Sequence, residues 1–329
     1  MANVVLFDRL GGPEVLRLAE LPLPEPGEGE ALVRIDAIGL NRAEALFRSG
    51  GYYYQPTLPA SRLGSEAAGL VEAVGPGVTD FAPGDQVSVL LVGMGMSEHG
   101  VYADRVVVRA EALLPRPAWV DAPVGAATWL SHLTAYGALL EVGRLQPGDP
   151  VLITAASSSV GTAAIQVAGQ IGAVPIAVTR SSAKTERLLQ VGAAHVIATD
   201  RDDLAERVRD LTGGKGARVV FDSVGGPGLT ALAENVAEDG ALIVYGWLDP
   251  RPAPLPMNWP LNVHGYGAHH VTRDPARMRR ATAFITAGLR TGALTPVIDR
   301  TFDLRDIAEA HRYMETNGQT GKIVVTVQH

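Results

Sequence analysis

The sequence predicts an α/β protein with a doubly wound parallel sheet preceded by a smaller β-barrel. Short Val/Leu/Ile-rich runs separated by Gly and Pro fill the first hundred residues, a pattern typical of all-β structure. From residue 151 onward, strand-like runs alternate with helical periodicity, which is typical of a parallel sheet covered by helices. The turn after the first of these runs consists of small residues, and such a turn can admit a ligand close to its backbone.

In the barrel, the predicted strands are the apolar runs 4–7, 15–18, 31–38, 68–74 and 86–91. Residues 41–49 interrupt them with a helical pattern, and residues 50–56 form a loop with three consecutive tyrosines, Tyr52 to Tyr54. Aromatic side chains at this density suit the wall of a pocket.

The second part opens with a predicted helix over 125–140. The strands expected after it are 151–153, 175–179, 195–198, 219–221, 241–245 and, near the C-terminus, 323–327. The helices expected between them begin at Thr162 and cover 204–212, 228–237 and 275–289.

The turn between the first strand and its helix is the strongest candidate for a dinucleotide site. Compared with G-x-G-x-x-G, it keeps only the last glycine. Its backbone N–H groups are predicted to bind a pyrophosphate at the helix N-terminus, and the residues concerned are Ala156, Ser157, Ser158, Ser159, Val160 and Gly161. The alternative is an ordinary crossover in which small residues only permit close packing of helix and strand.

The residues after the second strand indicate which dinucleotide would bind. A site for NAD places Asp or Glu about 20 residues after the glycines, but this chain reads Thr179, Arg180 and, four residues further on, Lys184. Two cations can hold a 2′-phosphate, so the sequence predicts NADPH. The alternative is a solvated basic turn before a charged helix.

Composition excludes several classes of protein. The 329 residues are 47% hydrophobic and carry a formal charge of −7, which argues against a nucleic-acid or membrane-surface partner. No apolar run approaches the length of a membrane span, and residues 1–5 are strand-like rather than a leader. We therefore expect a soluble, cytoplasmic protein. The absence of cysteine excludes disulfides, thiolate catalysis and cysteine-based zinc sites.

Several ordered motifs resemble the medium-chain dehydrogenase/reductase superfamily, and within it the zinc-free quinone oxidoreductase branch. The matching stretches are 39–44, 63–69, 74–87, 133–136, 155–161 and 221–226. The resemblance implies a GroES-like barrel domain over 1–121, a Rossmann-type NADP-binding domain over 122–267, and a return of 268–329 to the first domain. It also implies an active site between the two domains.

The chain departs from the zinc-dependent members of that superfamily. It has Ser65 in place of the histidine of their Gly-His-Glu motif, and Asn41 stands where their first cysteine ligand falls. His264, His269 and His270 cluster without an acid or cysteine at ligand spacing, so we expect them to be ordinary strand-end histidines. The sequence therefore predicts no metal.

The zinc-free branch implies reduction of a conjugated acceptor. In a quinone or an α,β-unsaturated carbonyl compound the carbonyl delocalises the incoming electrons, so the protein needs only to position the reactants and donate hydrogen bonds to the developing oxyanion. The alternatives are a zinc-free dehydrogenase or enoyl reductase in a biosynthetic pathway, and a cofactor-binding protein with little turnover.

The resemblance also assigns individual residues. Asn41 and Tyr52 match positions that face the nicotinamide or substrate, and the remaining matches to cofactor contacts are Thr134, Lys184, Tyr245 and Gly246. Asn41 has the alternative role of capping the 42–49 helix, and Tyr52 that of packing only.

Zinc-free relatives commonly pair their Rossmann domains edge to edge. Residues 261–268 fall where the last strand of the sheet should lie, and an unpaired edge can be continued by a two-fold partner. A homodimer is therefore expected. The alternative is a monomer, in which Gly265 and Gly267 make the segment a poor strand.

Overall fold

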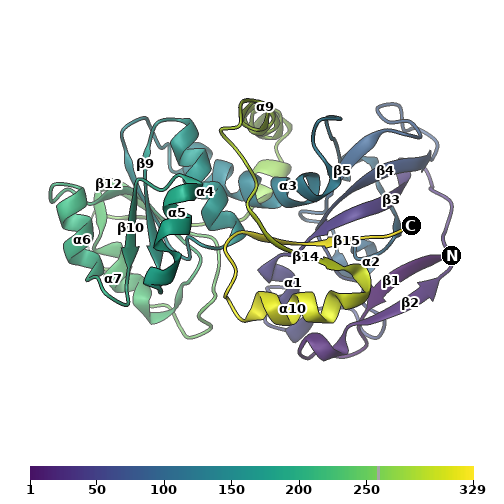
Figure 1. Ribbon diagram of the computed structural model, residues 1–329, viewed down its shortest axis with the longest axis horizontal. Coiled ribbons are helices and arrows are strands. Elements are labelled where there is room, and N and C mark those ends of the chain that lie inside the picture. Colours follow the sequence, from purple (N-terminus) through teal and green to yellow (C-terminus); the bar gives the residue numbers. More distant parts are fainter. Residues whose placement is uncertain (258–259) are drawn as a thin grey trace. The chain divides into compact units, whose positions relative to one another are not determined.

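The computed structural model describes residues 1–257 and 260–329, and the chain divides into two compact units. The first unit comprises Met1–Leu130 and Ile298–His329, and the second comprises Ser131–Val297. Both termini belong to the first unit (Figure 1). Residues 268–297, which the sequence groups with the returning segment, pack in the second unit. The functional domain boundaries themselves stay a prediction.

The first unit is built on a seven-stranded, largely antiparallel sheet and a two-stranded ribbon. Its strands are β1 (Ala2–Leu6), β2 (Arg17–Leu21), β3 (Glu30–Gly39), β4 (Glu66–Val74), β5 (Gln86–Leu90), β6 (Arg105–Arg109), β7 (Leu113–Pro115), β14 (Ile298–Asp303) and β15 (Lys322–Thr326). β1 and β2 form the ribbon, and the other strands form the sheet.

Strand β3 organises this unit because it pairs with three strands. One edge pairs with β4, while the other pairs first with β6 and then, over Ala37–Gly39, with β15. Two register shifts in the β3–β4 ladder mark irregularities of the kind that bend a sheet. Alternate residues of β3, including Val33 and Ile35, are fully buried, as period-2 side-chain alternation requires.

Three helices accompany the sheet: α1 (Arg42–Ser49), α2 (Met96–His99) and α10 (Ile307–Glu315). α10 packs on β14 and β15 and also touches α1 (Figure 1). A fourth helix, α3 (Ala122–Tyr136), begins in the first unit and ends in the second, where the chain continues as a π-helical segment, Gly137–Val142.

The second unit is a six-stranded parallel sheet. Its strands are β8 (Pro150–Ile153), β9 (Val174–Thr179), β10 (His195–Ala198), β11 (Ala217–Asp222), β12 (Val236–Val244) and β13 (Asn262–Gly265). Their spatial order is β10-β9-β8-β11-β12-β13, the arrangement of a dinucleotide-binding Rossmann fold. The order reverses between β8 and β11, and ligands of such sheets bind beyond the carboxyl ends of the strands at this point.

The helices of the second unit are α4 (Ser159–Gln170), α5 (Thr185–Val191), α6 (Leu204–Leu211), α7 (Leu229–Ala233), α8 (His269–Thr272) and α9 (Pro275–Thr291). Every residue of Val151–Ile153 is fully buried, as expected for a parallel strand covered on both faces. None of the helices in the described part of the chain is long and apolar enough to cross a membrane.

Several elements differ from the sequence-based expectation. Val236 and Ala237, which the sequence assigns to a helix, begin strand β12, because Val236 pairs with Ala217 in the parallel ladder with β11. Val15 ends a short 3₁₀ turn instead of starting a strand. The strands β6, β7 and β14 and the helix α10 were not predicted.

Candidate functional site

The small-residue turn after β8 leads into α4, and the turn is capped from within. Ser158 is the N-cap residue, and its hydroxyl accepts the Gly161 N–H at 3.0 Å. A Cβ at position 161 would lie 2.6 Å from the carbonyl oxygens of Ala155 and Ala156. Glycine is therefore required there for close packing of helix and turn.

Asp222 joins the ends of the two strands at the reversal point. Its carboxylate accepts the Thr154 hydroxyl at 2.6 Å and the Gly225 N–H at 2.7 Å. Burial raises the pKa of Asp222, while these two donors act in the opposite direction. The hydrogen bonds fix the carboxyl end of β11 against that of β8.

Next to Asp222, two buried hydroxyl groups lack hydrogen-bond partners among the described residues, namely Ser223 Oγ and Tyr245 Oη. Burial raises the pKa of Tyr245 to about 12, and its ring stacks on Phe221 at 4.1 Å between centroids. A Cβ at Gly246 would lie 2.9 Å from the Ser223 carbonyl oxygen. Unpartnered buried hydroxyls at the carboxyl edge of the sheet fit a polar ligand.

The predicted cations lie at the carboxyl end of β9. Thr179 is buried and ends the strand, whereas Arg180 is exposed directly after it. The Lys184 ammonium reaches back to the turn after β8 and donates to Ser157 Oγ at 3.0 Å. The nearby carboxylate of Asp200 accepts the Ser182 N–H and hydroxyl, each at 3.0 Å. This edge of the sheet thus presents positive charge next to the small-residue turn.

The structure therefore gathers most of the predicted cofactor residues of the second unit along one edge of its sheet. They lie at or just after the carboxyl ends of β8, β9 and β12, and they are Ala156, Ser157, Ser158, Ser159, Val160, Gly161, Thr179, Arg180, Lys184, Tyr245 and Gly246. The remaining one, Thr134, is buried on α3.

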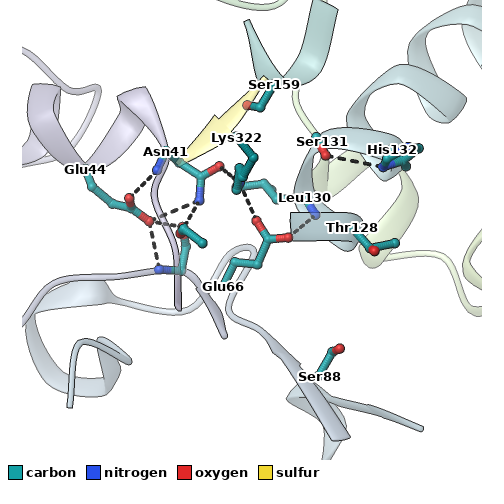
Figure 2. A network of polar contacts seen from close by, with 12 residues as sticks. Asn41, Glu44, Glu66, Ser88, Thr128, Leu130, Ser131, His132, Ser159 and Lys322 are labelled. Atoms are coloured by element: carbon teal, nitrogen blue, oxygen red, sulfur yellow. Dashed lines mark hydrogen bonds and ion pairs between the residues drawn. The ribbon is translucent and has the colours of Figure 1, made fainter. Parts of the chain in front are cut away.

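In the first unit, Asn41 is the N-cap residue of α1, but its side chain is engaged elsewhere. Its Nδ2 donates to Gly39 O and to Glu44 Oε1, both at 3.2 Å, and its Oδ1 accepts from Lys322 Nζ at 2.6 Å. Figure 2 shows Asn41 between Glu44 and Lys322. Both amide N–H groups and the carbonyl oxygen are thus held by the protein.

Lys322 is the other end of this arrangement. Its ammonium also pairs with Glu66 Oε2 at 2.7 Å, and both side chains are almost completely buried. Glu66 Oε1 accepts the N–H of Leu130 at 3.1 Å (Figure 2). A buried cation beside Asn41 is therefore compensated by one buried carboxylate.

Tyr52 lies in an aromatic cluster that follows α1. Its ring is 6.4 Å from that of Phe47 and 5.1 Å from that of Tyr54. Burial is the largest of the causes that raise its pKa far above the usual range, and the charge of Glu44 adds to it. The Tyr52 phenol therefore keeps its proton at neutral pH.

Sequence reasoning missed the residues that hold Asn41, namely Glu44 and Lys322. Glu44 has a local signal: it is the third residue after the N-cap, and its carboxylate accepts the Asn41 N–H at 2.6 Å, as in a capping box. Lys322 is separated from Asn41 by 281 positions, and no local pattern connects the two.

The donor set is unsuitable for zinc. Within residues 1–257 and 260–329, no group of three or more His, Asp or Glu side chains could hold a metal ion. Asn41 Oδ1 is already 2.6 Å from a lysine ammonium, and a divalent cation would be repelled by that charge. Of the three clustered histidines, His264 lies in β13, whereas His269 and His270 open α8 instead of ending a strand.

Two family models match parts of the chain. The family model described as alcohol dehydrogenase GroES-like domain matches residues 27–118, and the one described as zinc-binding dehydrogenase matches residues 191–325. Quinone oxidoreductase 1 of Escherichia coli is 36% identical over 333 residues, covering 98% of each chain. A 2-haloacrylate reductase of Burkholderia sp is 30% identical over the full length of both chains.

A solved structure is similar over the whole chain. The crystal structure of Escherichia coli quinone oxidoreductase complexed with NADPH superimposes with a TM-score of 0.90 at 28% identity, covering 98% of this chain and 99% of the other.

Proposed function

Since the chain belongs to the zinc-free quinone oxidoreductase branch of the medium-chain dehydrogenase/reductase superfamily, we propose that it is an NADPH-dependent oxidoreductase. It transfers hydride to a quinone or an α,β-unsaturated carbonyl compound. Its similarity to a 2-haloacrylate reductase as well as to quinone oxidoreductases supports this range of acceptors. The observation in the structure that carries the proposal is the cationic edge of the parallel sheet, where Lys184 reaches the small-residue turn.

The residues at this edge fit the cofactor. The turn from Ala156 to Gly161 lies at the N-terminus of α4 and suits a pyrophosphate, while Arg180 and Lys184 suit a 2′-phosphate. The N–H groups of Ala156, Ser158 and Gly161 already donate to Val178 O, Ala155 O and Ser158 Oγ, so we assign the pyrophosphate to the N–H groups of Ser157, Ser159 and Val160. Thr134, Thr179, Tyr245 and Gly246 complete the proposed set. The buried Tyr245 hydroxyl has no hydrogen-bond partner within the described part of the chain. NADPH, when bound, supplies the hydride.

The chain's own residues orient the acceptor and stabilise charge on it. The Tyr52 phenol stays protonated at neutral pH, so it can donate a hydrogen bond to the oxyanion that develops on the acceptor. The two amide N–H groups of Asn41 are already donated to Gly39 and Glu44. We therefore assign Asn41 the role of shaping the site. We assign Tyr52 the role of hydrogen-bond donor to the acceptor, in exchange for the hydrogen bond that its hydroxyl makes with Tyr53.

Absorbance at 340 nm tests this proposal. The protein is mixed with NADPH and either 1,4-benzoquinone or an α,β-unsaturated ketone, and we expect oxidation of NADPH with at least one acceptor above the rate without protein. Tight NADPH binding with no oxidation by either acceptor would instead support a cofactor-binding protein with little turnover.

Turnover should not depend on a metal. Position 65 is serine, and Asn41 lies against an ammonium group, so no side chain there can serve as a zinc-site histidine or thiolate. We expect full activity after exhaustive chelation, and elemental analysis should find no stoichiometric zinc. One zinc per chain that is needed for turnover would contradict the mechanism.

We also propose a homodimer formed through β13, and a cytoplasmic location. β13 is the last strand of the sheet, pairs with β12, and is exposed at all four residues. Such an edge presents unpaired backbone groups that a second copy can bind. Light scattering at micromolar concentration should give about twice the chain mass of 34.6 kDa. A mass near that of one chain would contradict the dimer.

The backbone of β13 indicates the variant that tests the edge. The Tyr266 N–H donates to Val244 O at 2.8 Å, so proline at 266 would also damage the chain's own sheet. The backbone N–H groups of successive residues in a strand point to opposite sides of that strand. The N–H of Val263, three residues before Tyr266, therefore points away from β12, toward the open edge of the sheet. Val263→Pro should yield a monomer, whereas a dimer of wild-type stability would place the interface elsewhere.

A further inference from the structure

Beyond Asn41 and the Glu44 that holds it, a row of further buried polar side chains of the first unit continues the same network, and no role has been assigned to them above. Arg48 and Glu44 come from α1, His311 from α10, and Tyr102 from the segment between α2 and β6. All four are essentially inaccessible to solvent. Such a network is expensive to bury unless each member is satisfied.

The direction of every hydrogen bond in this row follows from Arg48. Its guanidinium can only donate, so His311 Nδ1, 2.7 Å from Arg48 NH1, must be an acceptor. Burial, together with the charge of Arg48, lowers the pKa of His311 to about 3, and the neutral ring therefore carries its hydrogen on Nε2. That N–H points at the Tyr102 oxygen at 3.2 Å.

Tyr102 must then direct its own hydrogen to Glu44. The phenol donates to Glu44 Oε2 at 2.8 Å. Glu44 also accepts the Ser65 N–H at 3.0 Å, the Ser65 hydroxyl at 2.6 Å, the Asn41 N–H at 2.6 Å and the Asn41 Nδ2 at 3.2 Å. These donors favour the ionised form of the carboxyl group, because a proton on it would oppose one of them, and they act against the burial that favours the neutral form.

A second fixed cation, Lys322, determines which way the side-chain amide of Asn41 is turned. Lys322 can only donate, so the atom that faces it is Oδ1, and Nδ2 is left to face Glu44. The Asn41 amide is thus held between a lysine that requires its oxygen and a carboxylate that requires its nitrogen. If Glu44 became protonated, the second requirement would be lost.

We propose that Arg48, His311 and Tyr102 are positioning residues for the reaction, which hold Glu44 as a carboxylate and through it fix the side-chain amide of Asn41. The inference rests on the proposed function, because Asn41 is assigned to the site of that reaction. The row is anchored at its far end, where Arg48 donates to Gly11 O at 3.1 Å and to Glu315 at 2.6 Å.

The pH dependence of turnover tests the inference. Burial raises the pKa of Glu44 above its usual value, and the hydrogen bonds from Ser65, Asn41 and Tyr102 oppose this. The titratable and charged groups that act on Glu44 directly are Tyr52, Tyr54, Tyr102 and Lys322. His311, Arg48 and Glu66 act on Tyr102 or on its neighbours. Tyr102→Phe removes one donor to the carboxylate, so the pKa of Glu44 rises further.

We expect the acid limb of kcat in the Tyr102→Phe variant to move upward by about one pH unit, the size of one hydrogen bond to a charged group. Tyr266→Phe is the matched control, because it removes a buried hydroxyl that has no partner among the described residues; its profile should equal that of the wild type. In the Glu44→Gln background, Tyr102→Phe should produce no further shift. An acid limb at the wild-type pH in a folded Tyr102→Phe variant would overturn the inference.

If Tyr102→Phe does not fold, His311→Asn replaces it. Asparagine keeps a polar atom near the position of Nδ1 but removes the Nε2–H, so the acid limb should move in the same direction by a smaller amount. An unshifted limb in a folded His311→Asn variant would equally overturn the inference.

Equilibrium unfolding tests the same row of hydrogen bonds without measuring turnover. A failure of the inference can therefore be distinguished from a failure of the proposed function. A carboxyl group whose pKa is raised in the folded state loses stability as the pH rises through that pKa. Between the usual pKa of a glutamate and the raised pKa of Glu44 in the folded protein, the difference in unfolding free energy between wild type and Tyr102→Phe should therefore widen as the pH rises. The corresponding difference for Tyr266→Phe should stay constant. A constant difference for Tyr102→Phe would contradict the inference even if the protein proves to be inactive.

Discussion

Replacing Lys322 with methionine is expected to lower the free energy of unfolding by about 3–5 kcal/mol, because it leaves the buried carboxylate of Glu66 without its countercharge. The two side chains are 1% and 0% exposed, and their charged atoms are 2.7 Å apart. Methionine is close to lysine in length, so loss of packing volume contributes little. Chemical denaturation followed by intrinsic fluorescence measures the effect.

Two further variants identify the cause of that loss. Glu66→Gln in the Lys322→Met background removes the uncompensated charge and keeps an acceptor for the Leu130 N–H, so the double variant should be more stable than Lys322→Met alone. Arg105→Met breaks the half-exposed pair with Glu72, whose atoms are 2.9 Å apart, and should cost under about 1 kcal/mol. If the Glu66 change destabilised the Lys322→Met protein further, the ion pair would not be the source of stability.

NADPH is expected to bind at least tenfold more tightly than NADH, and the Arg180→Ala/Lys184→Ala variant should lose this preference. A 2′-phosphate held by two cations should contribute more than about 1.4 kcal/mol, which corresponds to a factor of ten in affinity. Fluorescence titration of both cofactors gives the ratio of dissociation constants. Lys184 already lies 3.0 Å from Ser157 in the turn, so it needs little reorganisation to reach a ligand there.

A charge-matched variant controls for long-range electrostatics. Arg187→Ala/Lys215→Ala removes the same formal charge from two exposed positions of the same unit, and it should leave the ratio between the cofactors unchanged. Equal affinities of the wild type for NADPH and NADH would refute the cofactor assignment. An unchanged ratio of the two dissociation constants in the Arg180→Ala/Lys184→Ala variant would show that other residues bind the 2′-phosphate.

The sequence predicted the parts of the fold that local patterns determine. Helix α1 was expected over 42–49 and β10 over 195–198, and the structure has both at these positions, because apolar periodicity and flanking breakers mark their ends. The small-residue turn and Gly161 were also visible. Val236 and Ala237 were assigned wrongly, since their helical character is overridden by pairing with β11.

Of the candidate site, only the residues that belong to local motifs could be predicted from the sequence. Asn41 could be named from its local motif, but the groups that orient it come from distant segments: Tyr102 and His311 act through Glu44, and Lys322 binds it directly. Contacts between residues separated by 58 to 281 positions leave no periodic trace in a single sequence. Which atom donates and which accepts in these hydrogen bonds is determined by the two fixed cations, Arg48 and Lys322.

The most direct test of the central claim is transfer of a labelled hydride. NADPH carrying deuterium at C4, supplied separately as its two stereoisomers, is incubated with the protein and an α,β-unsaturated ketone, and the reduced product is analysed by mass spectrometry. The account predicts deuterium in the product from one stereoisomer and none from the other, because a protein that orients both reactants uses one face of the cofactor. Unlabelled product from both stereoisomers, or no product from either, would contradict hydride transfer to this class of acceptor.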